Sequence, residues 1–191
     1  MIAGAERHLV ATPGQTAGPF HGFALPWPGG QHLVPPGSPG AVRFTGRVLD
    51  GAGAGVPDAL VEIWQADAGG RVPQVAGSLR RDGHTFTGFA RAHTDDTGRF
   101  SFTTVRPGAV GGGRPFIAVG VVARGLLDRL VTRAYLPAPG DGLAADPFLA
   151  TVEPARRATL VAVDDGRALH FDVRLQGEHE TVFLAFPNHR R

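Results

Sequence analysis

Short segments of this chain alternate apolar and polar residues with a period of two, and clusters of glycine, proline and aspartate separate them. This period is typical of half-buried β-strands, because successive side chains point to opposite faces of a sheet. Only 146–152 suggests a helix, of one or two turns. Strands are expected at 42–49, 60–67, 85–93, 98–105, 116–123, 129–136, 158–163, 168–175 and 181–186. Such a series of short strands predicts an all-β fold, an antiparallel β-sandwich.

The first 41 residues show no such periodicity and are rich in glycine, proline and histidine. Turn signals such as TPG and LPWPGG favour an extended segment, and a disordered tail is the alternative. Several residues are too apolar for a purely solvated leader, namely Phe20, Phe23, Leu25 and Trp27. We therefore divide the chain into an N-terminal arm, 1–41, that contacts a partner and a sandwich domain, 42–191.

The composition excludes several kinds of chemistry. There is no cysteine, so disulfides, thiolate nucleophiles and cysteine-based metal sites are ruled out. The 19 basic residues are all arginine, which excludes lysine Schiff bases. The arginines form no stripe interleaved with aromatic residues, so a nucleic-acid partner is not expected. No apolar stretch reaches the roughly 18 residues of a membrane span, and we expect a cytoplasmic protein without a membrane partner.

Local motifs for catalysis are equally absent. The glycine run at 108–113 is not a P-loop, because the chain has no lysine, and a strand-like segment follows it where a dinucleotide fold needs a helix. The eight histidines never occur one or three residues apart, which are the usual cues for a metal-binding pair. Asp95 and Asp165 lie in turns and are expected to bond their own backbone. The residues alone therefore predict no self-contained active site.

Longer motifs resemble the intradiol ring-cleavage dioxygenases. They are TPGQTAGPF (12–20), ALVEIWQADAGGR (59–71), TDDTGRFSFTTVRPG (94–108) and HFDVRLQGEHETVFLAF (170–186). Together with the segments between them, these motifs cover nearly the whole chain. The second and third also occur in prealbumin-like sandwich domains, so a binding or interaction domain without enzymatic activity is the alternative. The first and last motifs favour the dioxygenases.

The resemblance implies a non-haem ferric ion held by two tyrosines and two histidines. At the matching positions this chain has Val72, Val110, Phe116 and Ala118, and its single tyrosine, Tyr135, is not at a ligand position. All four side chains are hydrocarbons. The resemblance therefore implies that this chain binds no metal and contributes no catalytic residue itself.

Within the family, this pattern is similar to an iron-free alpha subunit that pairs with a homologous beta subunit holding the Fe(III). The implied reaction is cleavage of 3,4-dihydroxybenzoate by O₂ to 3-carboxy-cis,cis-muconate, in a pocket at the alpha–beta interface of a higher-order oligomer. The alpha wall of that pocket maps onto Thr16, Gly18, Pro19, Phe20 and Arg124. Phe20 replaces a more usual tyrosine, so only its aromatic face is expected to contribute.

Overall fold

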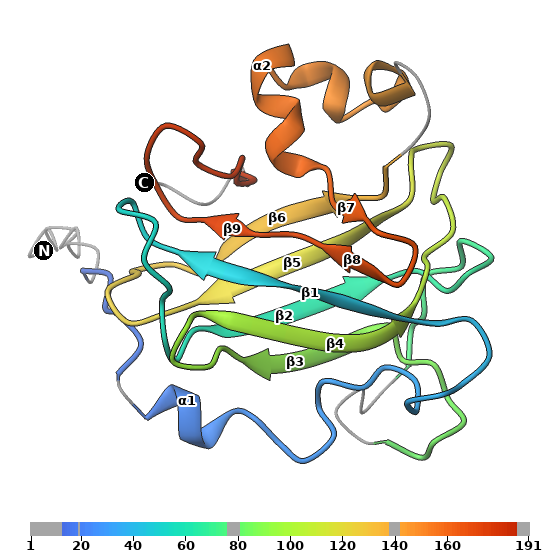
Figure 1. Ribbon diagram of the computed structural model, residues 1–191, viewed down its shortest axis with the longest axis horizontal. Coiled ribbons are helices and arrows are strands. Elements are labelled where there is room, and N and C mark those ends of the chain that lie inside the picture. The colour runs from blue at the N-terminus through green and yellow to red at the C-terminus, as the bar shows by residue number, and fades with distance from the viewer. Residues whose placement is uncertain (1–12, 19, 76–80, 138–141, 187–191) are drawn as a thin grey trace, which may run out of the picture.

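Two β-sheets face each other in the computed structural model, which describes residues 13–18, 20–75, 81–137 and 142–186 (Figure 1). One sheet has the order β4-β1-β8-β7, with β9 also paired to β1, and the other has the order β3-β2-β5-β6. The first contains β1 (Ala41–Leu49), β4 (Arg99–Val105), β7 (Val163–Asp164), β8 (Ala168–His170) and β9 (Val173–Arg174). The second contains β2 (Leu60–Gln65), β3 (Phe89–His93), β5 (Phe116–Val122) and β6 (Leu130–Tyr135).

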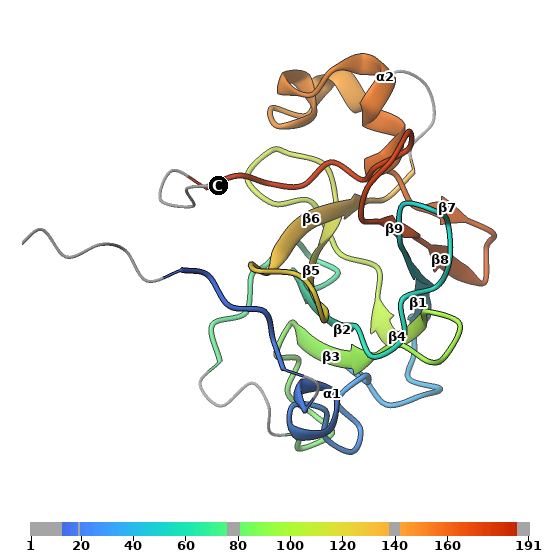
Figure 2. The ribbon, with the colours of Figure 1, turned by 90° about the vertical axis from the view of Figure 1, so that its left-hand side faces the viewer.

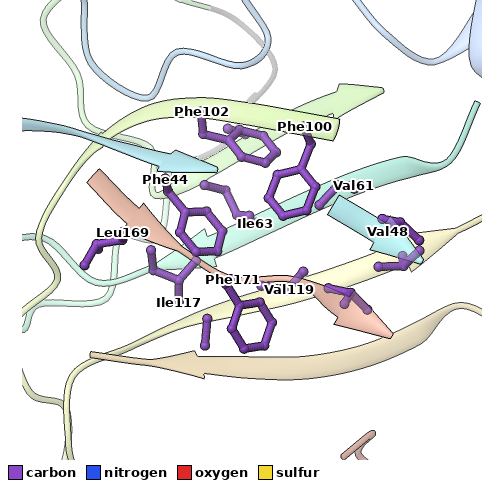
Figure 3. Packing of buried hydrophobic residues seen from close by; sticks show 14 of the residues in the cluster. Phe44, Val48, Val61, Ile63, Phe100, Phe102, Ile117, Val119, Leu169 and Phe171 are labelled. Carbon is purple, nitrogen blue, oxygen red and sulfur yellow. The ribbon is translucent and has the colours of Figure 1, made fainter. Parts of the chain in front are cut away.

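The core lies between the sheets and follows the alternation of the strands (Figure 3). Along β4, for example, Phe100 and Phe102 are buried, whereas Arg99 and Ser101 are exposed. Phe44 of β1 packs between these two rings and Phe171, at centroid distances of 5.8 to 6.4 Å. Burying these large side chains is the main force that holds the two sheets together.

The predicted fold class is confirmed, and so are the strands expected at 42–49, 60–67, 98–105, 116–123 and 129–136, within three residues at each end. The segment 85–93 becomes a strand only at Phe89, after Gly88 with its φ of +71°. The segment 168–175 divides into β8 and β9, both parallel to β1. The side chains alternate as in a strand, since Leu169 and Phe171 are buried while the His170 side chain is partly exposed.

Two strand predictions were wrong. Residues 158–163 begin as a 3-10 helix, η3 (Ala158–Leu160), and become extended only at the end. A short apolar run fits a buried helical turn as well as a strand, and here Leu160 fills a small second core with Tyr135 and Leu149. Residues 181–186 are extended but form no strand, although the Leu184 N–H donates to the Val131 carbonyl at 2.7 Å.

The remaining helical segments are short. The helix expected near 146–152 appears as η2 (Leu149–Thr151), and it follows η1 (Gly142–Ala145) and precedes α2 (Pro154–Arg157). These segments lie together beyond the β6 side of the sandwich (Figures 1 and 2). The fourth, α1 (His21–Ala24), lies in the arm. Among the described residues, no helix is long and apolar enough to cross a membrane.

The second half of the arm packs against the edges of both sheets. Trp27 stacks on Phe89 of β3 at 6.2 Å, and Arg91 of β3 donates to the Leu25 carbonyl at 3.0 Å. Leu33 is buried and donates its N–H to Thr103 of β4. Nearer the start of the described part of the arm, Phe20 and Phe23 remain largely exposed.

Candidate functional site

The positions at which the resemblance places metal ligands lie in the loops that follow β2 and β4 and in the first half of β5. We call Val72, Val110, Phe116 and Ala118 the ligand-position cluster. The loop after β2 and the loop after β4 touch through their backbones, since Gly108 donates its N–H to the Asp67 carbonyl at 2.8 Å. A Cβ built on Gly70 would lie 2.1 Å from the Ala109 oxygen, so only glycine permits this approach. Val72 and Val110 lie in these two loops.

A positively charged side chain lies beside Phe116, the third member of this cluster. The Arg133 guanidinium of β6 is stacked between the rings of Phe116 and Phe148, at 4.4 and 4.8 Å from their centroids. The fourth member, Ala118, pairs in register with Arg133 on one side and with Trp64 on the other. A guanidinium enclosed by two rings gains from cation–π attraction on both faces.

A buried hydrogen-bond network fixes this guanidinium. Arg133 Nη1 donates to the Tyr135 hydroxyl at 3.1 Å, and that hydroxyl donates to Asp146 Oδ1 at 3.2 Å. Asp146 also accepts the backbone N–H groups of Phe148, Leu149 and Arg114 at 2.8 to 3.0 Å. Burial raises the pKa of Tyr135, so its hydroxyl remains a donor at neutral pH. The Tyr135 hydroxyl is therefore engaged in structural hydrogen bonds with Arg133 and Asp146.

This cluster does not fit a ferric ion. Its four side chains carry no nitrogen, oxygen or sulfur, and iron needs such donor atoms. A permanently charged guanidinium stands next to Phe116 and would repel a second cation. In the parts of the chain that the structure describes, no three histidine, cysteine, aspartate or glutamate side chains are grouped to hold a metal.

The residues assigned to the pocket wall lie elsewhere. We call Thr16, Gly18, Phe20 and Arg124 the arm cluster; Pro19 falls outside the described residues. Arg124 pairs with Asp58 at 3.0 Å, and both side chains are about half exposed, 53% and 51%. Asp58 in turn approaches α1, because a Cβ on Gly22 would lie 3.8 Å from the Asp58 Cβ.

The arm continues along the loop that follows β5. A Cβ on Gly14 would lie 3.6 Å from the Leu127 Cβ, close in sequence to Arg124. The Thr16 hydroxyl donates to the neighbouring Ala17 carbonyl, and a Cβ on Gly18 would meet nothing within 4 Å. The Phe20 side chain is 76% exposed. The arm cluster is thus an open surface rather than a closed pocket.

The two clusters lie at opposite ends of the same strand. Phe116 begins β5 and Val122 ends it, and Arg124 follows two residues later. A strand rises about 3.3 Å per residue, so these ends are roughly 20 Å apart. The arm cluster of one chain therefore cannot complete the ligand-position cluster of that same chain.

Three contributors to these surfaces were not identified from the sequence. Arg133 and Tyr135 alternate in TRAY and so share a face of β6, which was a usable signal. Asp58, with its φ of +61°, offered no local signal for its pairing with Arg124. The turn aspartates behave as expected, since Asp95 accepts the N–H groups of Thr97 and Arg99, and Asp165 those of Arg167 and Ala168.

The chain is similar in sequence to known dioxygenases. A dioxygenase family profile matches residues 31–177. The protocatechuate 3,4-dioxygenase alpha chain of Burkholderia cepacia is 40% identical over 194 residues, which cover 92% of this chain and 98% of that one. The alpha chain of Pseudomonas putida is 40% identical over 200 residues, covering 93% and 98%. The beta chain from B. cepacia is also 40% identical, over 157 residues that cover 73% of this chain and 66% of that one.

A solved structure shares the fold. The dioxygenase domain of a carbohydrate-binding fusion protein from Streptomyces sp. SirexAA-E superposes with a TM-score of 0.57 at 26% identity, covering 87% of this chain and 99% of that chain. The predicted resemblance is therefore confirmed by a profile that covers more than half of the sequence and by alpha-chain relatives that match nearly all of it. The chain belongs to the intradiol ring-cleavage dioxygenase family.

Proposed function

We propose that this chain is the iron-free alpha subunit of a protocatechuate 3,4-dioxygenase. A homologous beta subunit holds the Fe(III), and the two chains share the pocket in which O₂ cleaves 3,4-dihydroxybenzoate to 3-carboxy-cis,cis-muconate. Both oxygen atoms enter the product, so no external reductant is needed. The alpha chain contributes one wall of the pocket and orients the substrate in a cytoplasmic, higher-order alpha–beta oligomer.

The separation of the two clusters along β5 is the observation that carries this proposal. The end of the strand that would hold a metal has only hydrocarbon side chains and a fixed guanidinium. The other end presents an arginine, an open glycine and an exposed aromatic ring. A wall without its own metal site is useful only to a second chain.

The surface around the arm cluster also suits a partner. Phe20, Phe23 and Leu127 are all more than half exposed, and the arm joins them at one end of the sandwich. Exposed apolar side chains that gather in this way mark interaction surfaces. We assign the arm, 1–41, to contact with the beta subunit on these grounds.

Arg124 has the chemistry to select an aromatic acid. Its partner Asp58 is half exposed, and ion pairs of this kind contribute only about 0–1 kcal/mol. A substrate carboxylate can therefore replace Asp58 as the partner of the guanidinium, with two parallel hydrogen bonds. The alternative, a prealbumin-like interaction domain, gives no role to the arm cluster and has no support in the family match.

Co-expression with a beta-type homologue that retains both tyrosines and both histidines tests the proposal. The two chains are expected to co-purify in equal ratio with one iron per pair, and the pair should consume O₂ with protocatechuate. Expressed alone, this chain should carry no stoichiometric iron and no tyrosinate-to-iron charge-transfer colour. A coloured, iron-loaded preparation of this chain alone would disprove the proposal.

Replacing Arg124 with alanine is expected to raise the KM for protocatechuate about tenfold, the loss of one charge-assisted contact, while the KM for catechol changes little. Asp58→Asn is the matched control, because it breaks the same ion pair but leaves the guanidinium. Steady-state kinetics of the alpha–beta complex with both substrates separates the effects of the two substitutions. Equal effects of both substitutions, on both substrates, would show that Arg124 only stabilises the loop.

A further inference from the structure

Arginines are concentrated on the outer face of the other sheet, far from either cluster. Arg43 and Arg47 point outward from β1, Arg99 points outward from β4, and Arg167 lies in the turn before β8. With His170 of β8 they form what we call the basic face. Three carboxylates lie near its four guanidinium groups, namely Asp165, Asp172 and Asp95, so one positive charge is in excess.

The fold places like charges together on this face. Arg47 and Arg99 are direct cross-strand partners in the antiparallel pair of β1 and β4. Like charges directly opposite each other destabilise a sheet. Both side chains are exposed, and no core packing compensates for the repulsion. An anion bound between the arginines would remove this cost.

The carboxylates nearby are already committed. Asp172 accepts the Arg47 backbone N–H at 2.8 Å and approaches its guanidinium at 3.8 Å. Asp165 lies 2.9 Å from His170 Nε2 and accepts two backbone N–H groups. Among the described residues, Arg43, Arg99 and Arg167 form no ion pair at salt-bridge distance, and Asp95 attracts Arg99 only at longer range.

These three arginines line one concavity of about 550 Å³, together with Ser101, His170 and one acidic residue, Asp165, whose carboxylate is held by His170 and the turn backbone. A second hollow of about 530 Å³ adjoins it and shares Arg99 and His170. Volumes of this size are typical of sites for small molecules. The guanidinium group binds carboxylate and phosphate in a bidentate manner, and three of them around one hollow favour a ligand with several anionic groups.

We infer that the concavity lined by Arg43, Arg99 and Arg167 is a binding site for a small polyanion that carries two or more carboxylate or phosphate groups. The concavity lies on the outer face of the β4-β1-β8 sheet, whereas Arg124 of the arm cluster follows β5 of the other sheet. Figures 1 and 2 show these two sheets as separate layers. Its ligand is thus separate from the substrate. The site is argued independently of the proposed function, and only its test uses the alpha–beta complex.

Isothermal titration of the purified alpha–beta complex tests the site, with pyrophosphate and citrate as probes and benzoate and chloride at equal ionic strength as controls. One polyanion per alpha chain is expected, and the probe that binds more tightly distinguishes phosphate from carboxylate chemistry. Arg43→Gln and Arg99→Gln should each weaken binding at least tenfold. The control Arg71→Gln, at a side chain that is 86% exposed and paired with Asp67, should leave binding unchanged.

The thermal stability of the variants independently tests the repulsion between Arg47 and Arg99. Without ligand, Arg99→Gln should leave the Tm unchanged or raise it, because it relieves the repulsion from Arg47. Binding that Arg71→Gln weakens equally, or that chloride reproduces, would overturn the inference. A complex that binds neither probe but dissociates when Arg43 and Arg99 are replaced would also overturn it, since the face would then contact an acidic protein surface.

Discussion

Replacing Asp146 with alanine is expected to lower the free energy of unfolding by about 3–5 kcal/mol, the cost of removing one member of a buried charged network. Its side chain is only 4% exposed. It accepts three backbone N–H groups and the Tyr135 hydroxyl. Alanine would leave all four donors without a partner, and each buried unsatisfied donor costs about 1–3 kcal/mol.

The same carboxylate should make stability depend on pH. Burial alone would raise the pKa of Asp146, but hydrogen bonds from the backbone of Arg114, Leu149 and Phe148 outweigh burial and hold the pKa below its ordinary value. A lowered pKa in the folded state stabilises the protein above the unfolded pKa, and this contribution is lost as pH falls through the folded pKa. The difference in the free energy of unfolding between wild type and Asp146→Ala should therefore become smaller in acid.

Chemical denaturation at neutral pH and in acid measures both effects. Asp96→Ala is the matched control, because Asp96 is an exposed turn aspartate, and it should change stability by no more than about 0.5 kcal/mol. Equal stability of the Asp146 and Asp96 variants would contradict the assigned network. A difference in the free energy of unfolding between wild type and Asp146→Ala that stayed constant as the pH fell would also contradict it.

The sandwich could be predicted from sequence because its central strands show their pattern locally. FSF in β4 buries two rings on one side and exposes Ser101 on the other, so both its secondary structure and its facing follow from the letters. The segment 158–163 has no such alternation. Its geometry is set by the packing of Leu160 against Tyr135 of β6 and Leu149 of η2. Both partners lie more than ten residues earlier in the chain.

The candidate site depends on the family resemblance rather than on a local pattern, and its residues stay a prediction. The resemblance points to Phe116, Ala118 and Arg124, and their positions along β5 then explain why one chain cannot use both clusters. The Arg133 network could not be derived in the same way. It joins β6 to Asp146 and Phe148, which lie more than ten residues further along the chain, and only the tertiary fold brings these residues together.

Restoring the four ligand residues should not by itself create an iron site. The variant Val72→Tyr, Val110→Tyr, Phe116→His, Ala118→His regains the donor set that the family uses, but it keeps Arg133 next to residue 116. With two tyrosinates, a ferric centre retains one positive charge. The guanidinium lies 4.4 Å from the centroid of the Phe116 ring. For an assumed separation of about 5 Å, two unit charges would repel by roughly 3 kcal/mol at an effective dielectric constant near 20, which is about a hundredfold in affinity.

Adding Arg133→Gln to this quadruple variant should therefore increase iron binding by about two orders of magnitude and produce the tyrosinate-to-iron absorption band. Arg129→Gln in the same background is the matched control, because Arg129 also lies beside β5 but is paired with Glu62 at 2.8 Å. Iron titration followed by visible absorbance compares the three proteins. If the Arg129 and Arg133 variants bound iron equally well, the loss of any positive charge near β5 would explain the gain, and the position of Arg133 would have no special effect. If the quadruple variant alone bound iron tightly, the guanidinium between Phe116 and Phe148 would not be what excludes the metal.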